Sequence, residues 1–207
     1  MNSETATRSY RMSARAEATA ETGRKIIAAV TELWREKSLD DITLQEVADR
    51  AGVTVQTVFR RFGSKEGLVE AAIASGETGV RDSQHDLPVG DIEQALDYIL
   101  AHYERDGAAV LRTLALEDKL PAAKRLAEHG RQVHRDWCVR VFAPYLPISD
   151  GEMYPVRLDA FVAATDLYLW KLIRCDLGRT VEQTRQAIST LLCALADYNT
   201  VKQQEGD

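Results

Sequence analysis

Two short helices joined by a tight turn are predicted by residues 43–65, TLQEVADRAGVTVQTVFRRFGSK. Thr43 and Glu46 form a capping-box pattern, in which the hydroxyl and the carboxylate each satisfy a backbone N–H of the first turn. Gly52 can adopt the left-handed conformation of a tight turn, and Ala48 is small enough for two helices to cross closely. The stretch therefore predicts a helix-turn-helix.

The second helix of this pair runs from Thr54 to about Phe62 and has an outward face without an acidic residue. Its outward side chains are Thr54, Gln56, Thr57, Arg60 and Arg61. Such a helix can lie in the major groove of DNA, where each base pair offers a distinct pattern of donors and acceptors. By spacing alone, the pair also fits an ordinary helical hairpin in which Gly52 only ends a helix.

The helical period continues on both sides of this stretch. A first helix carries an apolar stripe of Ile26, Ile27, Val30, Leu33 and Trp34. A fourth helix starts at Lys65 and is expected to end inside the irregular segment 76–90. Beyond it we expect a bundle of five helices: one over 92–100, one around 110–116, one from Pro121, one from a capping pattern at 149–152 to about Leu177, and one capped by Thr180.

The expected fold is all-α, with an N-terminal three-helix helix-turn-helix domain followed by a larger helical bundle. Only 5 of the 207 residues are proline and 12 are glycine, which argues against a β-sandwich or barrel. We place a basic flexible arm at 1–17, a DNA-binding domain at 18–75, and a helical ligand-binding and dimerisation domain at 76–207. The arm either enters the minor groove or remains a solvated tail.

Charge is unevenly distributed along the chain. The net charge is −6, which alone argues against a nucleic-acid partner. Residues 1–67, however, carry 11 Lys and Arg against 10 Asp and Glu, whereas residues 68–207 carry 15 against 22. The front part could therefore approach phosphate and the rest could not.

The sequence also bears on the cellular compartment. Cys138, Cys175 and Cys193 form no C-x-x-C pair, so neither a zinc ribbon nor a disulfide framework is indicated. Neither a signal peptide nor a membrane helix is recognisable. We expect a cytoplasmic protein without a membrane partner.

A longer motif unites the first four helices. Its marks are the Ile26-Ile27-x-Ala29-x-x-x-Leu33-Trp34 stripe, Thr43, Val47-Ala48-x-x-Ala51-Gly52-Val53, Thr57-Val58-Phe59, and Phe62-x-Ser64-Lys65-Glu66-x-Leu68. The segment from Thr22 to Ile73 thereby resembles the N-terminal DNA-binding domain of the TetR (tetracycline repressor) family. The resemblance is clear over this segment only, and it weakens the case for an ordinary hairpin.

The resemblance implies roles for eight residues: Thr43, Thr54, Gln56, Thr57, Phe59, Arg60, Arg61 and Lys65. Thr43 and Lys65 would hold phosphates at helix starts, where free N–H groups favour anions. Thr54, Gln56 and Thr57 would face bases or the adjoining backbone. Phe59 stands where the family commonly has a tyrosine, so its ring would either pack or touch a thymine methyl. Arg60 or Arg61 replaces a frequent histidine and adds charge.

For the rest of the chain, the resemblance implies a homodimer on a palindromic operator, blocking transcription until a small molecule releases it. The expected dimer interface comprises Phe161, Val162, Leu169, Leu172, Ile173, Leu191, Leu192 and Leu195, although each could equally be core. The expected effector-binding residues are Tyr103, His134, Trp137, Phe161, Asp166 and Trp170, although an aromatic stripe is more often core. We favour a neutral or cationic hydrophobic effector.

The sequence argues against two other classes of function. An enzyme is disfavoured because the chain has no H-E-x-x-H, P-loop, G-x-G-x-x-G or G-x-S-x-G motif, and no His is preceded at three residues by Glu. We therefore expect neither catalysis nor a cofactor nor a metal site. A helical adaptor that binds protein through the same fold is the other alternative, and the acid-free outward face argues against it.

Overall fold

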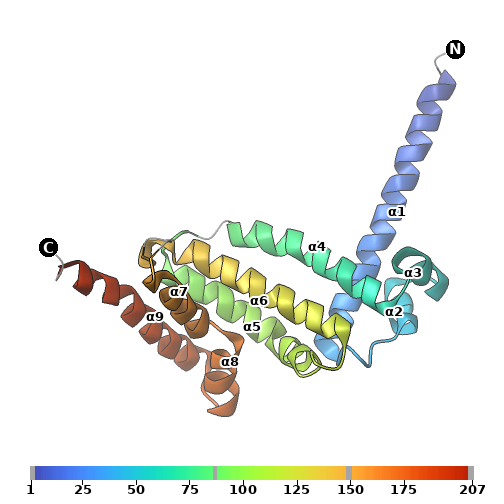
Figure 1. Cartoon of the computed structure of the whole chain (residues 1–207). Coiled ribbons are helices and arrows are strands. Elements are labelled where there is room, and N and C mark those ends of the chain that lie inside the picture. Colours follow the sequence, from blue (N-terminus) through green and yellow to red (C-terminus); the bar gives the residue numbers. More distant parts are fainter. Residues whose placement is uncertain (1–2, 86–87, 148–150, 205–207) are drawn as a thin grey trace. The chain divides into compact units, whose positions relative to one another are not determined.

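The computed structural model describes the backbone of residues 3–85, 88–147 and 151–204 and the side chains of residues 16–75, 88–147 and 151–197. These residues form helices and contain no strand (Figure 1). The expected all-α fold, with a helix-turn-helix followed by a larger set of helices, is confirmed. None of the described helices carries an apolar stretch long enough to span a bilayer.

The chain divides into two compact units. The first comprises Met1–Thr78 and Arg112–Leu126, and the second comprises Gly79–Leu111 and Ala127–Asp207. The expected boundaries are contiguous, whereas the structure adds 112–126 to the N-terminal unit. The reason is packing: Ala122 and Ala123 are fully buried in the core that the first four helices form.

The first unit is organised around α1 (Ser3–Glu36). Of its predicted stripe, Ile26, Val30 and Leu33 are buried in the core, and Ile27 and Trp34 are half-buried. Trp34 Nε1 donates a 2.8 Å hydrogen bond to Thr113 Oγ1, which ties the end of α1 to the added stretch. Residues 3–17, expected as a flexible arm, continue α1 as helix. The side chains of residues 1–15 lie outside the described residues, so an arm contact with DNA stays a prediction.

α2 (Leu44–Ala51) and α3 (Val55–Phe62) form the predicted helix-turn-helix beside α1 (Figure 1). The capping box is confirmed, because Glu46 N–H donates to Thr43 Oγ1 over 3.2 Å and Thr43 N–H donates to the Glu46 carboxylate over 3.0 Å. Gly52 has a φ of 67°, in the left-handed region. The turn is short, and Val47 and Val58, one from each helix, are fully buried in the core.

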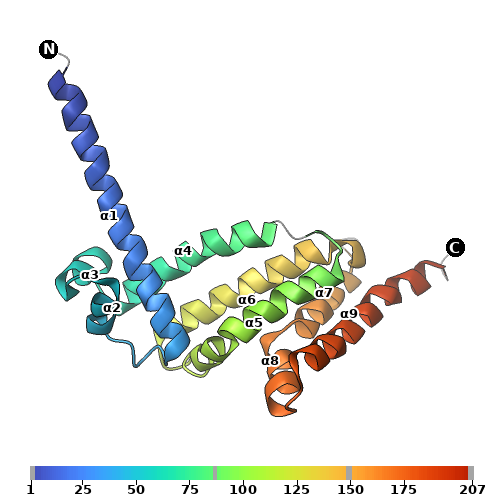
Figure 2. The same cartoon turned by 180° about the vertical axis from the view of Figure 1, so that it is seen from behind.

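α4 (Lys65–His85) starts at the predicted residue and ends inside the predicted segment. The second unit contains most of α5 (Ile92–Leu114) and α6 (Pro121–Val141), then η1 (Ala143–Tyr145), α7 (Met153–Ala164), α8 (Leu167–Trp170), the π-helical η2 (Lys171–Asp176) and α9 (Val181–Gln204). In both views α5 runs beside α6 and α7 beside α9 (Figures 1 and 2). Pro121 and Thr180 begin helices as predicted.

The prediction of separate helices over 92–100 and 110–116 is wrong, because α5 is continuous. Gly107 lies in the part between them and does not end the helix. A Cβ at this position would lie 2.8 Å from the Trp170 ring, so the glycine allows a close approach between α5 and α8. Tertiary packing thus overrides the low helix propensity of glycine.

The prediction of one helix as far as Leu177 is also wrong. The helix breaks at Thr165, and Asp166 caps α8 by accepting a 2.8 Å hydrogen bond from Tyr168 N–H. Side-chain capping competes with helix continuation at short polar residues, which explains the break. Of the capping pattern predicted at 149–152, residues 149 and 150 lie outside the described residues.

The Gly52 turn can be tested by substitution. We expect Gly52→Ala to lower the free energy of unfolding by about 1–2 kcal/mol, because a Cβ is strained in the left-handed region. No atom lies within 4 Å of the added Cβ, so the effect isolates the backbone conformation. Gly130→Ala in the exposed part of α6 is the matched control and should stabilise by about 0.5–1 kcal/mol. Equal effects of the two substitutions in urea unfolding would contradict the assignment.

Candidate nucleic-acid interface

The exposed face of α3 carries the side chains that sequence reasoning selected. Gln56 and Arg60 are both exposed and lie four residues apart, hence on the same face of the helix. Phe59, three residues after Gln56, is 60% exposed. Within the described part of the chain, neither Gln56 nor Arg60 has a side-chain hydrogen bond or ion pair. These three groups are therefore available to a ligand outside the chain.

The two threonines of α3 are engaged with each other. Thr54 Oγ1 accepts a 3.2 Å hydrogen bond from Thr57 N–H and so caps the helix. The two hydroxyl oxygens lie 2.9 Å apart and share a further hydrogen bond. Thr54 is exposed and Thr57 is half-buried. Both lie where they were predicted, but their hydroxyl groups already have partners.

Arg61 points back toward α1. A Cβ built on Gly23 would lie 2.7 Å from Arg61 Cζ and Nε, so the guanidinium covers the α1 backbone at this glycine. Gly23 is accordingly buried. The Arg61 Cζ also lies 5.8 Å from the centre of the Phe62 ring. The two adjacent arginines therefore differ: Arg60 extends from the outward face, while Arg61 covers the side that faces α1.

Thr43 and Lys65 lie at the starts of α2 and α4, as predicted. Lys65 Nζ donates to the Asp40 carbonyl over 2.9 Å, and partial burial lowers the pKa of Lys65. Thr43 Oγ1 lies 2.9 Å from the Glu46 carboxylate. Hydrogen bonds from Lys37 and Thr43 lower the pKa of Glu46 to about 2. Both predicted phosphate contacts therefore also stabilise the fold.

Several other cations of the first unit are neutralised by acids. Arg50 binds Glu36 with an N–O distance of 2.7 Å, and Lys37 binds Glu46 at 2.6 Å. Arg125 of α6 lies 3.0 Å from Glu70 of α4. These charges cancel locally, whereas Arg60 of α3 has no acidic partner among the described residues.

The six predicted effector residues gather around one residue that the sequence reasoning missed, Thr165. Its carbonyl accepts a 2.8 Å hydrogen bond from Tyr103 Oη, and its hydroxyl donates to the Phe161 carbonyl over 2.8 Å. The hydroxyl has one proton, so it accepts from His134 Nε2, 2.9 Å away. Thr165 thus joins α5, α6 and α7 in the interior of the second unit.

We call the buried groups that meet at Thr165, namely Tyr103, His134 and Cys138, the Thr165 centre. Burial determines the protonation of these groups. It raises the pKa of Tyr103, raises that of Cys138 to about 12, and lowers that of His134. The Cys138 thiol therefore stays protonated, 3.5 Å from the Thr165 hydroxyl. The centre is neutral, with the Asp166 carboxylate next in the chain.

Aromatic rings surround the centre and contact one another. Trp137 stacks on His134 with 5.8 Å between ring centres, and Tyr103 lies 5.9 Å from Trp170. Trp170 Nε1 donates to Glu104 over 2.9 Å. Trp137 Nε1 is buried and has no hydrogen-bond partner among the described residues. The predicted residues are brought together, but their side chains are packed against each other.

The eight predicted dimer residues separate into two groups. Phe161, Ile173 and Leu192 are buried within the chain itself, which assigns them to its core. Leu172 and Leu191 are 47% and 44% exposed, and Val162, Leu169 and Leu195 are half-buried. Further exposed apolar side chains on α7, α8 and the start of α9 were missed: Met153, Val156, Tyr168 and Val181.

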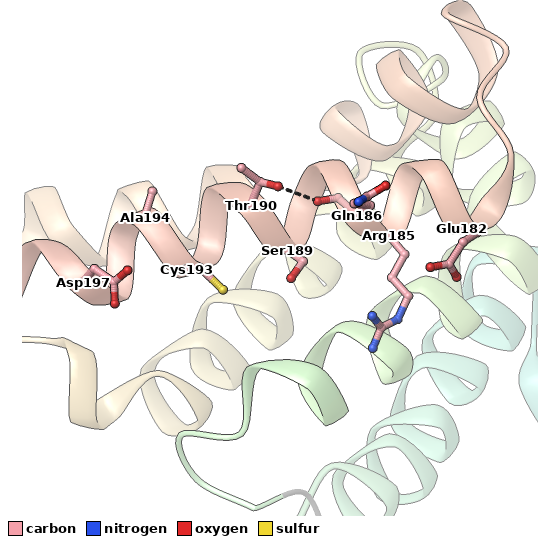
Figure 3. A pocket seen from close by; sticks show the side chains of 8 residues that line it. All are labelled: Glu182, Arg185, Gln186, Ser189, Thr190, Cys193, Ala194 and Asp197. Carbon is pink, nitrogen blue, oxygen red and sulfur yellow. Dashed lines mark hydrogen bonds between the residues drawn. The ribbon is translucent and has the colours of Figure 1, made fainter.

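Two surface pockets lie in the second unit. One follows a single face of α9 and is lined by Glu182, Arg185, Gln186, Ser189, Thr190, Cys193, Ala194 and Asp197 (Figure 3). Arg185 in this pocket is ion-paired with Asp97 of α5 at 2.9 Å. The other pocket is lined by Asp159, Val162, Ala163, Asp166, Tyr168 and Leu169. Asp166 is the one predicted effector residue in either lining.

Thr165 could have been found from the sequence by one signal. A Thr-Asp pair followed by the apolar run Leu167–Trp170 is typical of a helix N-terminus. Inside a longer apolar pattern, this signal marks a helix break and a place for polar groups. The local sequence does not indicate that Tyr103 and His134 bond to Thr165.

Burial of His134 leads to a prediction for stability. Because its folded pKa is lowered, the unfolded chain binds the additional proton first as the pH falls below about 6.5. The free energy of unfolding should therefore decrease on acidification, even though the Asp166 charge opposes the shift and His102 adds to it. In His134→Gln this part of the decrease should disappear. Urea unfolding at about pH 8 and about pH 5.5 measures it, and an unchanged pH dependence in the variant refutes the assignment.

Comparison with known proteins agrees with this geometry. Residues 26–72 match the family model of "Bacterial regulatory proteins, tetR family". Over 81 residues, the chain is 35% identical to the HTH-type transcriptional regulator BetI of Escherichia coli O139:H28 and equally to that of the K12 strain DH10B. The aligned region covers 37% of this chain and 42% of each relative, so the chain spans less than half the length of the curated relatives it matches.

A solved structure extends the likeness to most of the chain. A TetR transcriptional regulator from Rhodococcus sp. RHA1 superposes with a TM-score of 0.50 and 21% identity, covering 84% of this chain and 94% of that one. At this identity, the match supports the fold of both parts of the chain. The comparisons therefore show a helix-turn-helix segment of the tetR type at residues 26–72 and, for most of the chain, the fold of a TetR transcriptional regulator.

Proposed function

We propose that the protein is a transcriptional regulator that binds a palindromic DNA operator as a homodimer, represses transcription, and is released by a small molecule. The observation that carries the proposal is the exposed, acid-free face of α3. Gln56 and Arg60 have no partner within the described residues and share one helical face. An amide and a guanidinium on one face suit the base edges and phosphates of a major groove.

A homodimer follows from the small size of this interface. A single helix-turn-helix contacts few base pairs, so specific affinity generally requires two copies one helical turn apart. Exposed apolar side chains on α7–α9, including Leu172 and Leu191, support a surface that a second copy covers. The pocket with Val162, Leu169 and Tyr168 belongs to the same elements.

We place the effector site at the Thr165 centre. Its rings come from Tyr103, Trp137 and Trp170, and the nearby carboxylate is Asp166. This lining suits a neutral or cationic hydrophobic compound, because an anion would meet the carboxylate. The Tyr103 ring of α5 contacts Trp170, and His134 of α6 bonds to Thr165, so a ligand would have to separate α5 and α6 from the α7–α8 break. Such a movement would favour one conformation and lower the affinity for DNA.

The DNA-binding proposal predicts a defined salt dependence. With a duplex selected from random DNA, Arg60→Ala should lower affinity and reduce the slope of log affinity against log salt by about 1, because one phosphate contact is lost. Arg179→Ala, an exposed cation of the second unit, is the matched control and should leave the slope unchanged. Equal slopes for the wild type and Arg60→Ala would contradict a phosphate contact by Arg60.

The dimer proposal predicts the behaviour of surface variants. Leu172→Glu should shift the protein from dimer to monomer in sedimentation at micromolar concentration, because it places a charge in an apolar interface. Val89→Glu alters a similarly exposed apolar residue outside α7–α9 and should remain dimeric. A monomeric wild type would remove the dimer proposal, and a dimeric Leu172→Glu would move the interface elsewhere.

A further inference from the structure

Phe59 is an unusual residue for the surface of the first unit. Among the described residues of that unit, it is the one large hydrophobic side chain that is mainly exposed, at 60%. The neighbouring aromatic residue Phe62 is half-buried and packs against the core of the unit. The sequence left two roles for Phe59, packing within the chain or contact with DNA. Its exposure excludes the first.

The position of Phe59 indicates what it faces. It lies three residues after Gln56, so the two side chains are neighbours on α3. Arg60, four residues after Gln56, extends this face. Arg61 covers the opposite flank of the helix, where Gly23 of α1 lies. Phe59 is therefore part of the surface that meets DNA if the proposed function is correct.

The polar groups beside it have less capacity to read bases than their number suggests. The Thr54 and Thr57 hydroxyls bond to each other at 2.9 Å, and Lys65 Nζ bonds to the Asp40 carbonyl at 2.9 Å. Gln56 and Arg60 remain as free hydrogen-bonding groups on α3. An apolar contact would add discrimination between base pairs beyond what these two polar side chains supply.

In a major groove, the apolar group on a base edge is the C5 methyl of thymine. Charged phosphates offer a phenyl ring no comparable apolar contact, and its aromatic carbons gain free energy when they leave water. We propose that Phe59 is a specificity-determining residue that recognises the methyl group of a thymine in each half-site of the operator. This inference rests on the proposed DNA-binding function and adds the chemistry by which α3 selects one base.

The test removes the methyl group alone. Duplexes are first selected from random DNA by the full-length protein, and each thymine of the selected half-site is then replaced in turn by uracil. We expect one or two positions at which uracil weakens binding by the wild type about fourfold, the value for one methyl group withdrawn from water. Phe59→Ala should bind the thymine duplex more weakly and bind both duplexes equally.

Two variants control the experiment. Arg60→Ala lies on the same helical face and should lose affinity for both duplexes while keeping the fourfold ratio. Phe59→Tyr keeps the ring and should keep the ratio as well. Circular dichroism of Phe59→Ala should match the wild type, because the side chain is exposed.

The outcomes separate this inference from the function on which it rests. If no duplex is enriched, the DNA-binding proposal fails and the inference fails with it. If the wild type binds a selected duplex but is indifferent to uracil at every position, only the methyl contact is refuted. A Phe59→Ala protein that retains the full thymine preference also refutes it, because another residue then reads the methyl group.

Discussion

The candidate interface depends on the crossing of α2 and α3 at Gly52. The left-handed backbone of this glycine turns the chain sharply, and the small Ala48 leaves room for the second helix. Val47 and Val58 then bury the inner sides of both helices in the core that α1 helps to form. Because the inner side of α3 is held in this way, Gln56, Phe59 and Arg60 must point outward. The same crossing that stabilises the domain therefore sets the face that we propose to contact DNA.

Ion pairs determine which cationic side chains on the surface of the first unit are neutralised. Arg50 and Lys37 are matched by Glu36 and Glu46, which leaves them little attraction for a polyanion. Arg60 has no such partner among the described residues. A chain with a net charge of −6 can therefore still present a local positive face. The net charge gives little guidance to the binding partner, because 22 of the 32 acidic residues lie in residues 68–207.

In the second unit, the helix break at Thr165 brings polar groups together. Continuing α7 through Thr165 would have placed its carbonyl in a regular helical bond. At the break the carbonyl accepts from Tyr103 instead, and the hydroxyl, which donates to the Phe161 carbonyl, also accepts from His134, so helices distant in sequence meet at one neutral polar point. A satisfied polar centre surrounded by rings is rigid while its hydrogen bonds persist. Our proposal of an effector site rests on this centre, because breaking its hydrogen bonds would change the arrangement of the helices.

The sequence alone determined the helix-turn-helix, because capping residues, a turn glycine and helical apolar spacing act over a few residues. Thr43, Gly52, Gln56 and Arg60 lie where local rules put them. Tertiary structure decided what depends on contacts across long separations. Gly107 remains helical because Trp170 packs over it, Arg61 turns toward Gly23, and Phe161 is core. These outcomes depend on which helices become neighbours, and local propensity carries no information about that.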